Sequence, residues 1–249
     1  MRILLTNDDG YNAPGIQVLY QALKSQTKHD ISIAAPEGQR SATGHSITLF
    51  APLFVTEHAL EGSGKGFSIS GTPSDCVKLA VQGGLIPKPD LLISGINQGA
   101  NLGTDIFYSG TVSAAMEGVL LGIPSLALSL ANFEYKDFGP SAAYLVEHLD
   151  LLLKLRHKGL ININFPGKPR TEWRGLKVTR LGKAIYENVF EQRQDPRGRI
   201  YFWQSGNLVQ DCESDTDLTA IQNDFVSLTP MHSDLTDFAC LQTWKELFN

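Results

Sequence analysis

Short apolar runs alternate with helical patterns along most of this chain, and this alternation limits the possible fold more than any other feature. Apolar runs of strand length occupy residues 2–6, 31–35, 91–94, 125–129 and 160–165. Amphipathic helical patterns lie between them, at residues 14–26, 73–83, 110–121 and 140–156. Strands that are separated by helices of this length pair in parallel through helical crossovers. We therefore predict an α/β fold with a Rossmann-like, mostly parallel, doubly wound sheet and helices on both faces.

The pattern changes after Pro166. Residues 175–205 contain the short β-like runs KVTRL, AIYENVF and RIYFW, and the stretch Asp195-Pro196-Arg197-Gly198 between the last two runs has the composition of a type I turn. We predict a β-hairpin that extends from the main sheet. The sheet itself is expected to be complete by Phe165.

The end of the chain and the number of domains follow from the same patterns. The run FVSLT at 225–229 predicts a last strand, and a helix is expected from about Leu235. No internal repeat, low-complexity segment or Pro-rich linker divides the chain. We therefore expect residues 1–249 to form a single α/β domain, with an arm for oligomerisation at about 175–210.

Composition excludes several classes of function. The chain has 249 residues, 42% of them hydrophobic and 19% charged, and its net charge of −5 does not provide the clustered Lys and Arg of a broad nucleic-acid surface. It contains neither a signal peptide nor an apolar run long enough to span a bilayer. Cys76, Cys212 and Cys240 match neither a disulfide framework nor a zinc site. We expect a cytoplasmic protein that binds neither nucleic-acid polymers nor membranes.

Loops that follow three of the predicted strands are rich in polar residues and glycine. They are NDDG after the first strand (7–10), PEGQRSATGHS after the second (36–46) and SGINQGANLGTDIFYSGT after the LLIS strand (94–111). In an open parallel sheet the ligand crevice lies outside the carboxyl ends of the strands. We therefore expect these loops to form the functional site.

Asp8 and Asp9 are adjacent carboxylates at the end of the first predicted strand. Unit charges ~4 Å apart repel by roughly 4 kcal/mol at an effective dielectric constant near 20, so a partly buried pair requires a proton, a cation or separation. The stretch Asn-Asp-Asp-Gly is also favourable turn chemistry. Taken alone, it is explained equally well by a binding site and by a turn.

The same loops contain a set of oxygen ligands, namely Asp8, Asp9, Ser41 and Asn97. Carboxylate, hydroxyl and amide oxygens suit one Mg²⁺ or Mn²⁺ ion and disfavour zinc, for which Cys and His are expected. Simpler interpretations exist for two of these residues. Ser41 is also explained as a loop hydroxyl that caps its own backbone, and Asn97 as a left-handed turn residue before Gly99.

A phosphate-binding segment is predicted at Ser109-Gly110-Thr111, where a helix begins. The first N–H groups of a helix have no intrahelical partner and carry partial positive charge, which favours phosphate. Plain capping by Ser109 is the simpler explanation and is compatible with phosphate binding. Gly44 would allow the backbone to approach the phosphate, and Asn7 completes the predicted phosphate- and substrate-binding set.

Other catalytic patterns find little support. His45 is a candidate for proton transfer, but a polar loop histidine more often only forms hydrogen bonds. The chain has no G-x-S-x-G elbow, no Walker A loop and no G-x-G-x-x-G fingerprint. The sequence therefore disfavours hydrolase-triad, ATPase and dinucleotide-binding functions.

Several motifs occur together as a set. The stretches NDDG (7–10), RSATGHSIT (40–48), GTPSDCVKLA (71–80), SGINQGANLG (94–103), YSGTVSAAMEG (108–118) and VSLTPMHSDLT (226–236) resemble motifs of the SurE survival-protein family of nucleotidases. The resemblance runs from Met1 to about Thr236, in the same order and at compatible spacing. The combination is specific, although no single motif is.

This resemblance implies a divalent-metal-dependent phosphatase that releases phosphate from nucleoside 5′-monophosphates, with 3′-nucleotides and short polyphosphate as further substrates. The positions that hold the metal in the family fall on Asp8, Asp9, Ser41 and Asn97. Where many members have glycine after that serine, this chain has Ala42. Family members form dimers through an extension such as the predicted arm, and some assemble into tetramers, so a homodimer or tetramer is expected.

The chemistry leaves two routes open. In the first, Asp8 or Asp9 orients or deprotonates a water while the helix N-terminus at Ser109 stabilises the phosphate oxygens. In the second, an aspartyl-phosphate forms through Asp8. The alternative functions are a metal-dependent nucleoside hydrolase or sugar-nucleotide transferase, and a nucleotide-binding sensor without turnover.

Overall fold

The computed structural model describes residues 1–62, 64–154, 159–187, 189–204, 206–209 and 213–248. The strands of its central sheet are β1 (Arg2–Thr6), β2 (Asp30–Pro36), β3 (Val55–Ala59), β4 (Lys65–Ile69), β5 (Leu91–Gln98), β6 (Ser125–Ala131), β7 (Leu160–Pro166), β8 (Leu176–Val178) and β13 (Val226–Met231). The helices are α1 (Pro14–Gln26), α2 (Pro73–Gln82), α3 (Gly110–Leu120), α4 (Gly139–Lys154), α5 (Asp217–Gln222) and α6 (Phe238–Phe248), with 3₁₀ turns η1 (Gly103–Phe107) and η2 (Arg170–Glu172).

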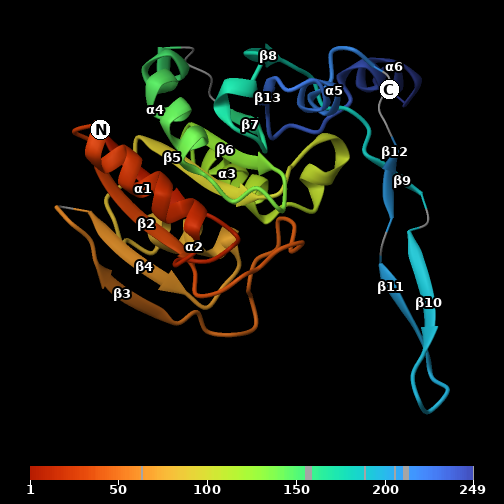
Figure 1. Cartoon of the computed structure of the whole chain (residues 1–249), viewed down its shortest axis with the longest axis horizontal. Helices are drawn as coiled ribbons and strands as arrows, with labels where there is room; N and C mark the ends of the chain where they lie inside the picture. The colour runs from red at the N-terminus through yellow and green to blue at the C-terminus, as the bar shows by residue number, and fades with distance from the viewer. Residues whose placement is uncertain (63, 155–158, 188, 205, 210–212, 249) are drawn as a thin grey trace.

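Within these ranges the sheet has nine strands in the order β3-β4-β2-β1-β5-β6-β7-β13-β8. The six strands from β4 to β7 in this order are parallel to one another. Helices cover both faces of the sheet (Figure 1). The prediction of a Rossmann-like, mostly parallel, doubly wound α/β fold is confirmed.

The sheet separates two hydrophobic cores, and β1 shows how the sequence forms both. Ile3 and Leu5 contribute to the core that contains residues of α1 and α4, whereas Leu4 contributes to the core that contains residues of α2 and α3. Because successive side chains of a strand point to opposite faces, a strand that is buried on both faces is apolar at every position. The central strands are therefore recognisable as continuous apolar runs.

The edges of the sheet differ from the sequence prediction. The sheet is not complete by Phe165, because β13 pairs antiparallel with β7 and β8 then pairs in parallel with β13. At the opposite edge, β3 pairs antiparallel with β4. Four of the five residues of β3 are exposed, so this strand lacks the apolar pattern that identifies a buried one.

A hairpin extends from the sheet, as predicted. Antiparallel strands β9 (Ile185–Glu187) and β12 (Asn207–Val209) form its first part, and antiparallel strands β10 (Phe190–Gln194) and β11 (Ile200–Gln204) form its second. At its tip the Gly198 N–H donates to the Asp195 carbonyl at 2.9 Å, which closes the predicted turn. We call residues 185–209 the arm, and Figure 1 shows it projecting away from the sheet. The run KVTRL contributes β8 to the sheet edge rather than to the arm.

Two helix limits differ slightly from the prediction. The helix from about Leu235 begins at Phe238, because Asp237 caps it by accepting the Cys240 N–H at 3.0 Å. The predicted end of α4 near Arg156 lies outside the described residues. Cys76 is buried and Cys240 exposed, both as free thiols, and Cys212 lies outside the described residues. No helix in the described ranges is long and apolar enough to cross a membrane.

Gly15 allows α1 to pack directly on β5. A Cβ at this position would lie 1.9 Å from the Ile96 carbonyl oxygen, which belongs to the strand backbone and has little room to move. We expect Gly15→Ala to lower the free energy of unfolding by about 1–3 kcal/mol or more, the usual cost of overpacking. Urea denaturation measures the change. Gly38→Ala is the control, because nothing lies within 4 Å of its added Cβ.

Candidate active site

The loops after β1, β2 and β5 lie at the same end of the strands, the carboxyl end, because β1 lies between β2 and β5 and is parallel to both. The Asn7 side chain shapes the first of these loops. Its amide donates to the Gly10 carbonyl at 2.9 Å and accepts the Gly10 N–H at 3.1 Å. Asn7 thus forms the turn that presents Asp8 and Asp9, with both of its polar atoms occupied. The turn interpretation of this stretch is therefore compatible with a site.

Asp8 is held in place by the start of α3. Its carboxylate is 4% exposed, and the Thr111 hydroxyl donates to its Oδ1 at 2.5 Å. Burial raises the pKa of Asp8 to about 6, and the nearby Asp9 charge adds to the rise while the Thr111 hydrogen bond opposes it. Gly110 makes the close approach possible, since a Cβ there would lie 2.7 Å from the Asp8 Cβ.

Asp9 contacts the end of β5. Its side chain is half-buried, and the Gln98 backbone N–H donates to its Oδ2 at 3.3 Å. Burial raises the pKa of this carboxyl as well, with the Gln98 hydrogen bond opposing the rise. The two predicted carboxylates therefore face different neighbouring elements, α3 and β5.

Asn97 lies inside β5, next to the residue that contacts Asp9. Its amide nitrogen donates to the Gly99 carbonyl at 2.9 Å, so its side-chain oxygen remains available as a ligand. The positive φ of 114° belongs to Gly99 and not to Asn97. The alternative interpretation of Asn97 as a left-handed turn residue is thus wrong.

The loop after β2 reaches the same place. Its Arg40 N–H donates to the Asp8 carbonyl at 2.7 Å, which fixes the residue before Ser41 beside the first loop. Ser41 is exposed, and its hydroxyl accepts a hydrogen bond from the Gln39 side chain at 3.0 Å. Ala42 has a φ of 56°, a left-handed conformation that glycine adopts without strain and that a residue with a Cβ rarely adopts.

The N-terminus of α3 is capped by Ser109. The Ser109 hydroxyl accepts the Val112 N–H at 3.0 Å, so Ser109 caps the helix as the simpler interpretation states. The hydroxyl hydrogen remains available to a ligand. The Gly110 N–H donates to no described residue. This end of the helix can therefore still contribute a hydroxyl and an amide to a bound anion.

Gly44 and His45 fasten the loop after β2 to α3. Gly44 has a φ of 55°, and its N–H donates to the Tyr108 carbonyl at 3.0 Å, so this N–H is not free for a phosphate. His45 lies 2.9 Å from Glu117, and Lys78 lies 3.6 Å from the other oxygen of that carboxylate. The hydrogen bond from His45 lowers the pKa of the buried Glu117, and the Lys78 charge adds to this effect. His45 is thus occupied in a hydrogen bond to Glu117.

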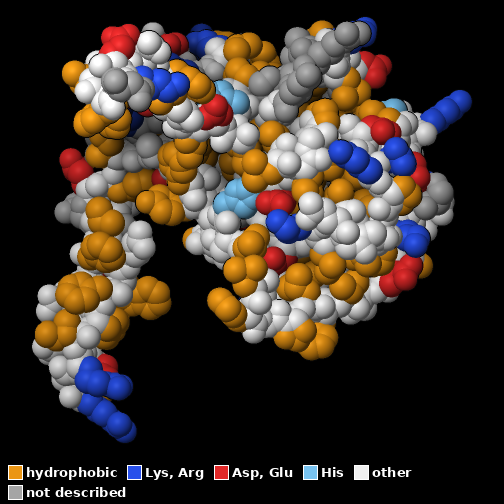
Figure 2. Space-filling view, turned by 180° about the vertical axis from the view of Figure 1, so that it is seen from behind, with side chains coloured by type: hydrophobic (Ala, Val, Ile, Leu, Met, Phe, Trp, Pro, Cys, Tyr) orange, Lys and Arg blue, Asp and Glu red, His pale blue; other side chains and the backbone are white. Residues whose placement is uncertain are grey.

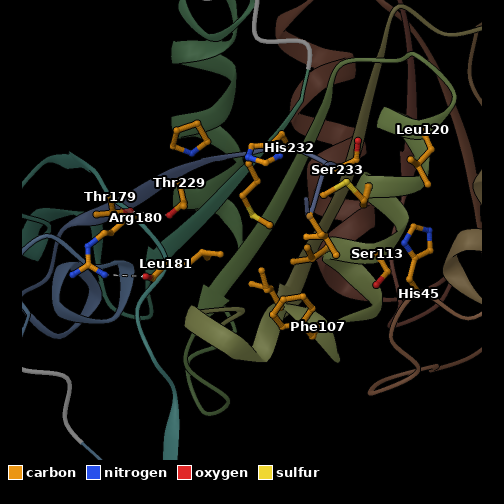
Figure 3. A pocket seen from close by; sticks show the side chains of 16 residues that line it. His45, Phe107, Ser113, Leu120, Thr179, Arg180, Leu181, Thr229, His232 and Ser233 are labelled. Atoms are coloured by element: carbon orange, nitrogen blue, oxygen red, sulfur yellow. Dashed lines mark hydrogen bonds between the residues drawn. The ribbon is translucent and has the colours of Figure 1, made fainter. Parts of the chain in front are cut away.

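A mostly apolar cavity of about 630 Å³ lies on another side of α3. It is lined by one face of this helix, by His45 and by the segments that contain Thr179 and His232 (Figure 3). None of the residues predicted to bind the metal or the phosphate lines it. Across the described chain no three His, Cys, Asp or Glu residues come together as a metal site, so any ion here would depend on mixed oxygen ligands.

Comparison with known proteins identifies the family. The family model described as "Survival protein SurE" matches residues 3–188. The chain belongs to the SurE family. A relative named 5′-nucleotidase SurE from Desulfitobacterium hafniense is 59% identical over 247 residues, which cover 99% of this chain and 96% of the relative. A second, from Pelotomaculum thermopropionicum, is 49% identical over 253 residues, covering 99% and 95%.

The crystal structure of a SurE protein from Aquifex aeolicus has the same fold. It superposes with a TM-score of 0.85 at 38% sequence identity, and the match covers 100% of both chains. The resemblance stated from the sequence motifs is confirmed. Because SurE relatives named 5′-nucleotidase match almost the whole chain, the prediction of an enzyme of the 5′-nucleotidase type is also confirmed.

Gln98 and Glu117 are site residues that sequence reasoning missed. Gln98 acts through its backbone N–H, so no side-chain pattern could have identified it. Glu117 could have been noticed in the sequence, because it is the single charged residue of a helix built otherwise of small and apolar residues. In the structure it is only 4% exposed. A buried carboxylate requires a partner, which His45 provides.

Proposed function

We propose that this SurE-family enzyme is a divalent-metal-dependent phosphatase that converts nucleoside 5′-monophosphates to nucleoside and phosphate. The observation that carries the proposal is the adjacent carboxylate pair: Asp8 lies against the N-terminus of α3, where Gly110 leaves room for the contact, and Asp9 lies against the end of β5. An anionic substrate and a carboxylate pair repel each other unless a cation lies between them. 3′-Nucleotides and short polyphosphate present the same phosphate group and are proposed as further substrates.

The donor set fits a hard divalent cation. Asp8 and Asp9 supply carboxylate oxygens, Asn97 an uncommitted amide oxygen and Ser41 an exposed hydroxyl. Burial and the charge of Asp9 raise the pKa of Asp8. A bound cation would favour the ionised carboxylate and so lower this pKa. We therefore infer one ion per subunit, Mg²⁺ or Mn²⁺, held by Asp8, Asp9, Ser41 and Asn97.

The roles of the protein groups follow from their accessibility. When bound, the ion would polarise the phosphate and activate a water. Asp9 is the less buried carboxylate and is the group that would accept the proton of the attacking water. The Thr111 hydroxyl fixes the orientation of Asp8. The Ser109 hydroxyl and the Gly110 N–H would donate to phosphate oxygens as charge develops on them.

One assay tests the function and its alternatives. Phosphate release is measured from a panel of 5′- and 3′-nucleotides and short polyphosphate with Mg²⁺, with Mn²⁺ and after chelation by EDTA. We expect turnover of 5′-monophosphates that EDTA abolishes and that either ion restores. Release of free base without phosphate would instead indicate a nucleoside hydrolase. Nucleotide and metal binding without turnover would indicate a sensor.

Ser109→Ala is expected to raise the KM for nucleotide about three- to tenfold, because a hydrogen bond to a charged phosphate is lost. Loss of the cap should also lower the stability by ~1 kcal/mol. Asp237→Ala is the control, since it removes the cap of α6 and should lower stability without a change in KM. Kinetics and thermal melts of both variants separate the two effects. A lower melting temperature with unaltered KM would show that Ser109 only caps the helix and does not bind phosphate.

We further propose that residues 1–249 form one domain whose arm mediates a homodimer or tetramer. Figure 2 shows hydrophobic side chains gathered along the arm. The exposed ones are Ile185, Tyr186, Phe190, Ile200, Tyr201, Phe202 and Trp203. The 11-residue helix α6 also has no buried residue, although isolated helices of this length are marginal in water. A second copy would cover such surfaces. The cysteine pattern supports a cytoplasmic location.

A further inference from the structure

The segment that leads into α3 is attached to residues 182–186, which comprise the three residues before the arm and its first two residues and which we call the base of the arm. That segment is η1, and Ser109 follows it closely in the chain. The two parts are far apart in sequence, yet the Thr104 hydroxyl donates to the Ala184 carbonyl at 3.2 Å. The Tyr186 hydroxyl also donates to the Asp105 carboxylate. The base of the arm is thus bound to η1, the segment just before the proposed phosphate site.

Asp217 fastens the same two segments from inside the protein. Its carboxylate is fully buried and accepts the Gly103 N–H at 2.8 Å with one oxygen and the Gly182 N–H at 2.9 Å with the other. Gly103 has a φ of 51°, and a Cβ there would lie 2.8 Å from the Gly182 carbonyl oxygen. The two backbones therefore lie close together at this point and share the Asp217 carboxylate as acceptor.

Hydrogen bonds transmit this attachment to the phosphate-binding residues. Within the turn, the Asp105 carbonyl accepts the Tyr108 N–H at 3.0 Å and the Ile106 carbonyl accepts the Ser109 N–H at 3.3 Å. The Tyr108 carbonyl in turn accepts the Gly44 N–H of the loop after β2. A displacement of η1 would consequently move Ser109, the adjacent Gly110 and the loop that carries Ser41.

We propose that Tyr186 and Asp217 are positioning residues, which hold η1 against the base of the arm and so make phosphate affinity depend on the placement of the arm. This inference rests on the proposed function for the identity of the ligand at Ser109 and Gly110. Neither side chain is assigned a contact with substrate. Contacts that a second copy makes with the arm would reach the site through these two residues.

Tyr186→Phe gives the sharpest test, because it removes only the hydroxyl that bonds to Asp105, whereas loss of the buried Asp217 would also affect folding. We expect the KM for a nucleoside 5′-monophosphate and the inhibition constant of inorganic phosphate to rise together, by about three- to tenfold, with kcat changed much less. Asp105→Ala should have the same effect, and the double variant no more than either, since both remove one bond. Asp105→Asn keeps an acceptor for Tyr186 and should restore near-normal values.

Tyr201→Phe is the matched control, because it removes the same atom from a tyrosine that is also 40% exposed but lies on β11, away from the base. It should leave both constants unchanged. Light scattering of every variant shows whether the assembly is intact. Unchanged KM and phosphate inhibition in Tyr186→Phe and Asp105→Ala would overturn the proposal. If the unmodified protein shows no turnover, the proposed function fails, and calorimetric titration of inorganic phosphate into the same variants still tests the positioning role.

Discussion

Asp9→Asn is expected to lower kcat/KM for nucleoside monophosphates by about a hundredfold or more while the fold is retained. Changes to residues that only support metal ligands already cost 10–100-fold, so loss of a charged ligand should cost at least as much. Asparagine is nearly isosteric with aspartate, and its amide oxygen can still accept the Gln98 N–H. The substitution therefore removes the charge and the proton acceptor with little change in packing.

Phosphate release with Mn²⁺ measures the kinetic effect of Asp9→Asn, and isothermal titration with Mn²⁺ measures metal affinity. Asp90→Asn is the matched control, because Asp90 directly precedes β5, at the end of the strand opposite to the site, and accepts the Arg2 N–H at 2.7 Å. The control should keep full activity. Full turnover together with unchanged Mn²⁺ affinity in Asp9→Asn would contradict both the metal-binding and the proton-accepting roles of this residue.

The buried strands could be predicted from the sequence because they bury both faces. The run LLIS is apolar at three successive positions, whereas LININF places Ile161, Ile163 and Phe165 in one core and its two asparagines on the other face, where they are buried and bonded to Asn101. Both runs form fully paired strands inside the sheet. The edge strands β3 and β8 could not be predicted in the same way. The exposed residues of VTEHA and LKV have no alternation that specifies a partner, so the pairing depends on the strands that are already in place.

The side chains of the candidate site could be identified from the sequence, but most of the contacts that hold them could not. Charge and position after a strand point to Asp8 and Asp9 as candidates. Their partners include the Thr111 hydroxyl and the Gln98 backbone N–H, which become neighbours only when α3 and β5 pack beside β1. Backbone donors leave no side-chain signature, and the spacing between these residues along the chain has no fixed period.

The two roles of Asp217 illustrate the same limit. As the first residue of the short helix α5, Asp217 occupies a position where an acidic residue is typical. That local explanation hides its contacts with Gly103 and Gly182, which are distant in the chain. Burial of the carboxyl raises its pKa, with the backbone N–H groups opposing the rise. Only the tertiary structure distinguishes a residue that stabilises a helix terminus from one that also connects two distant backbone segments.

Replacement of residues 184–205 by a short Gly-Ser linker is expected to reduce the assembly to a smaller oligomer or a monomer. A two-stranded ribbon is marginally stable in water by itself, and in this chain the aromatic side chains of the arm remain exposed, Phe190 by 66% and Trp203 by 59%. An exposed edge of this length also invites uncontrolled pairing unless a partner covers it. A second copy of the arm provides a matching surface by symmetry.

Light scattering at micromolar concentration compares the intact protein with the linker variant. Trp203→Ser tests the same contact with one residue, and Gln204→Ser, next to it on β11, is the control that should leave the assembly intact. Because the linker variant also lacks Tyr186, its KM should rise even where its metal affinity is unchanged. A monomeric intact protein would rule out the assembly through the arm, whereas an oligomer that dissociates on replacement of the arm and in Trp203→Ser would establish the arm as the interface.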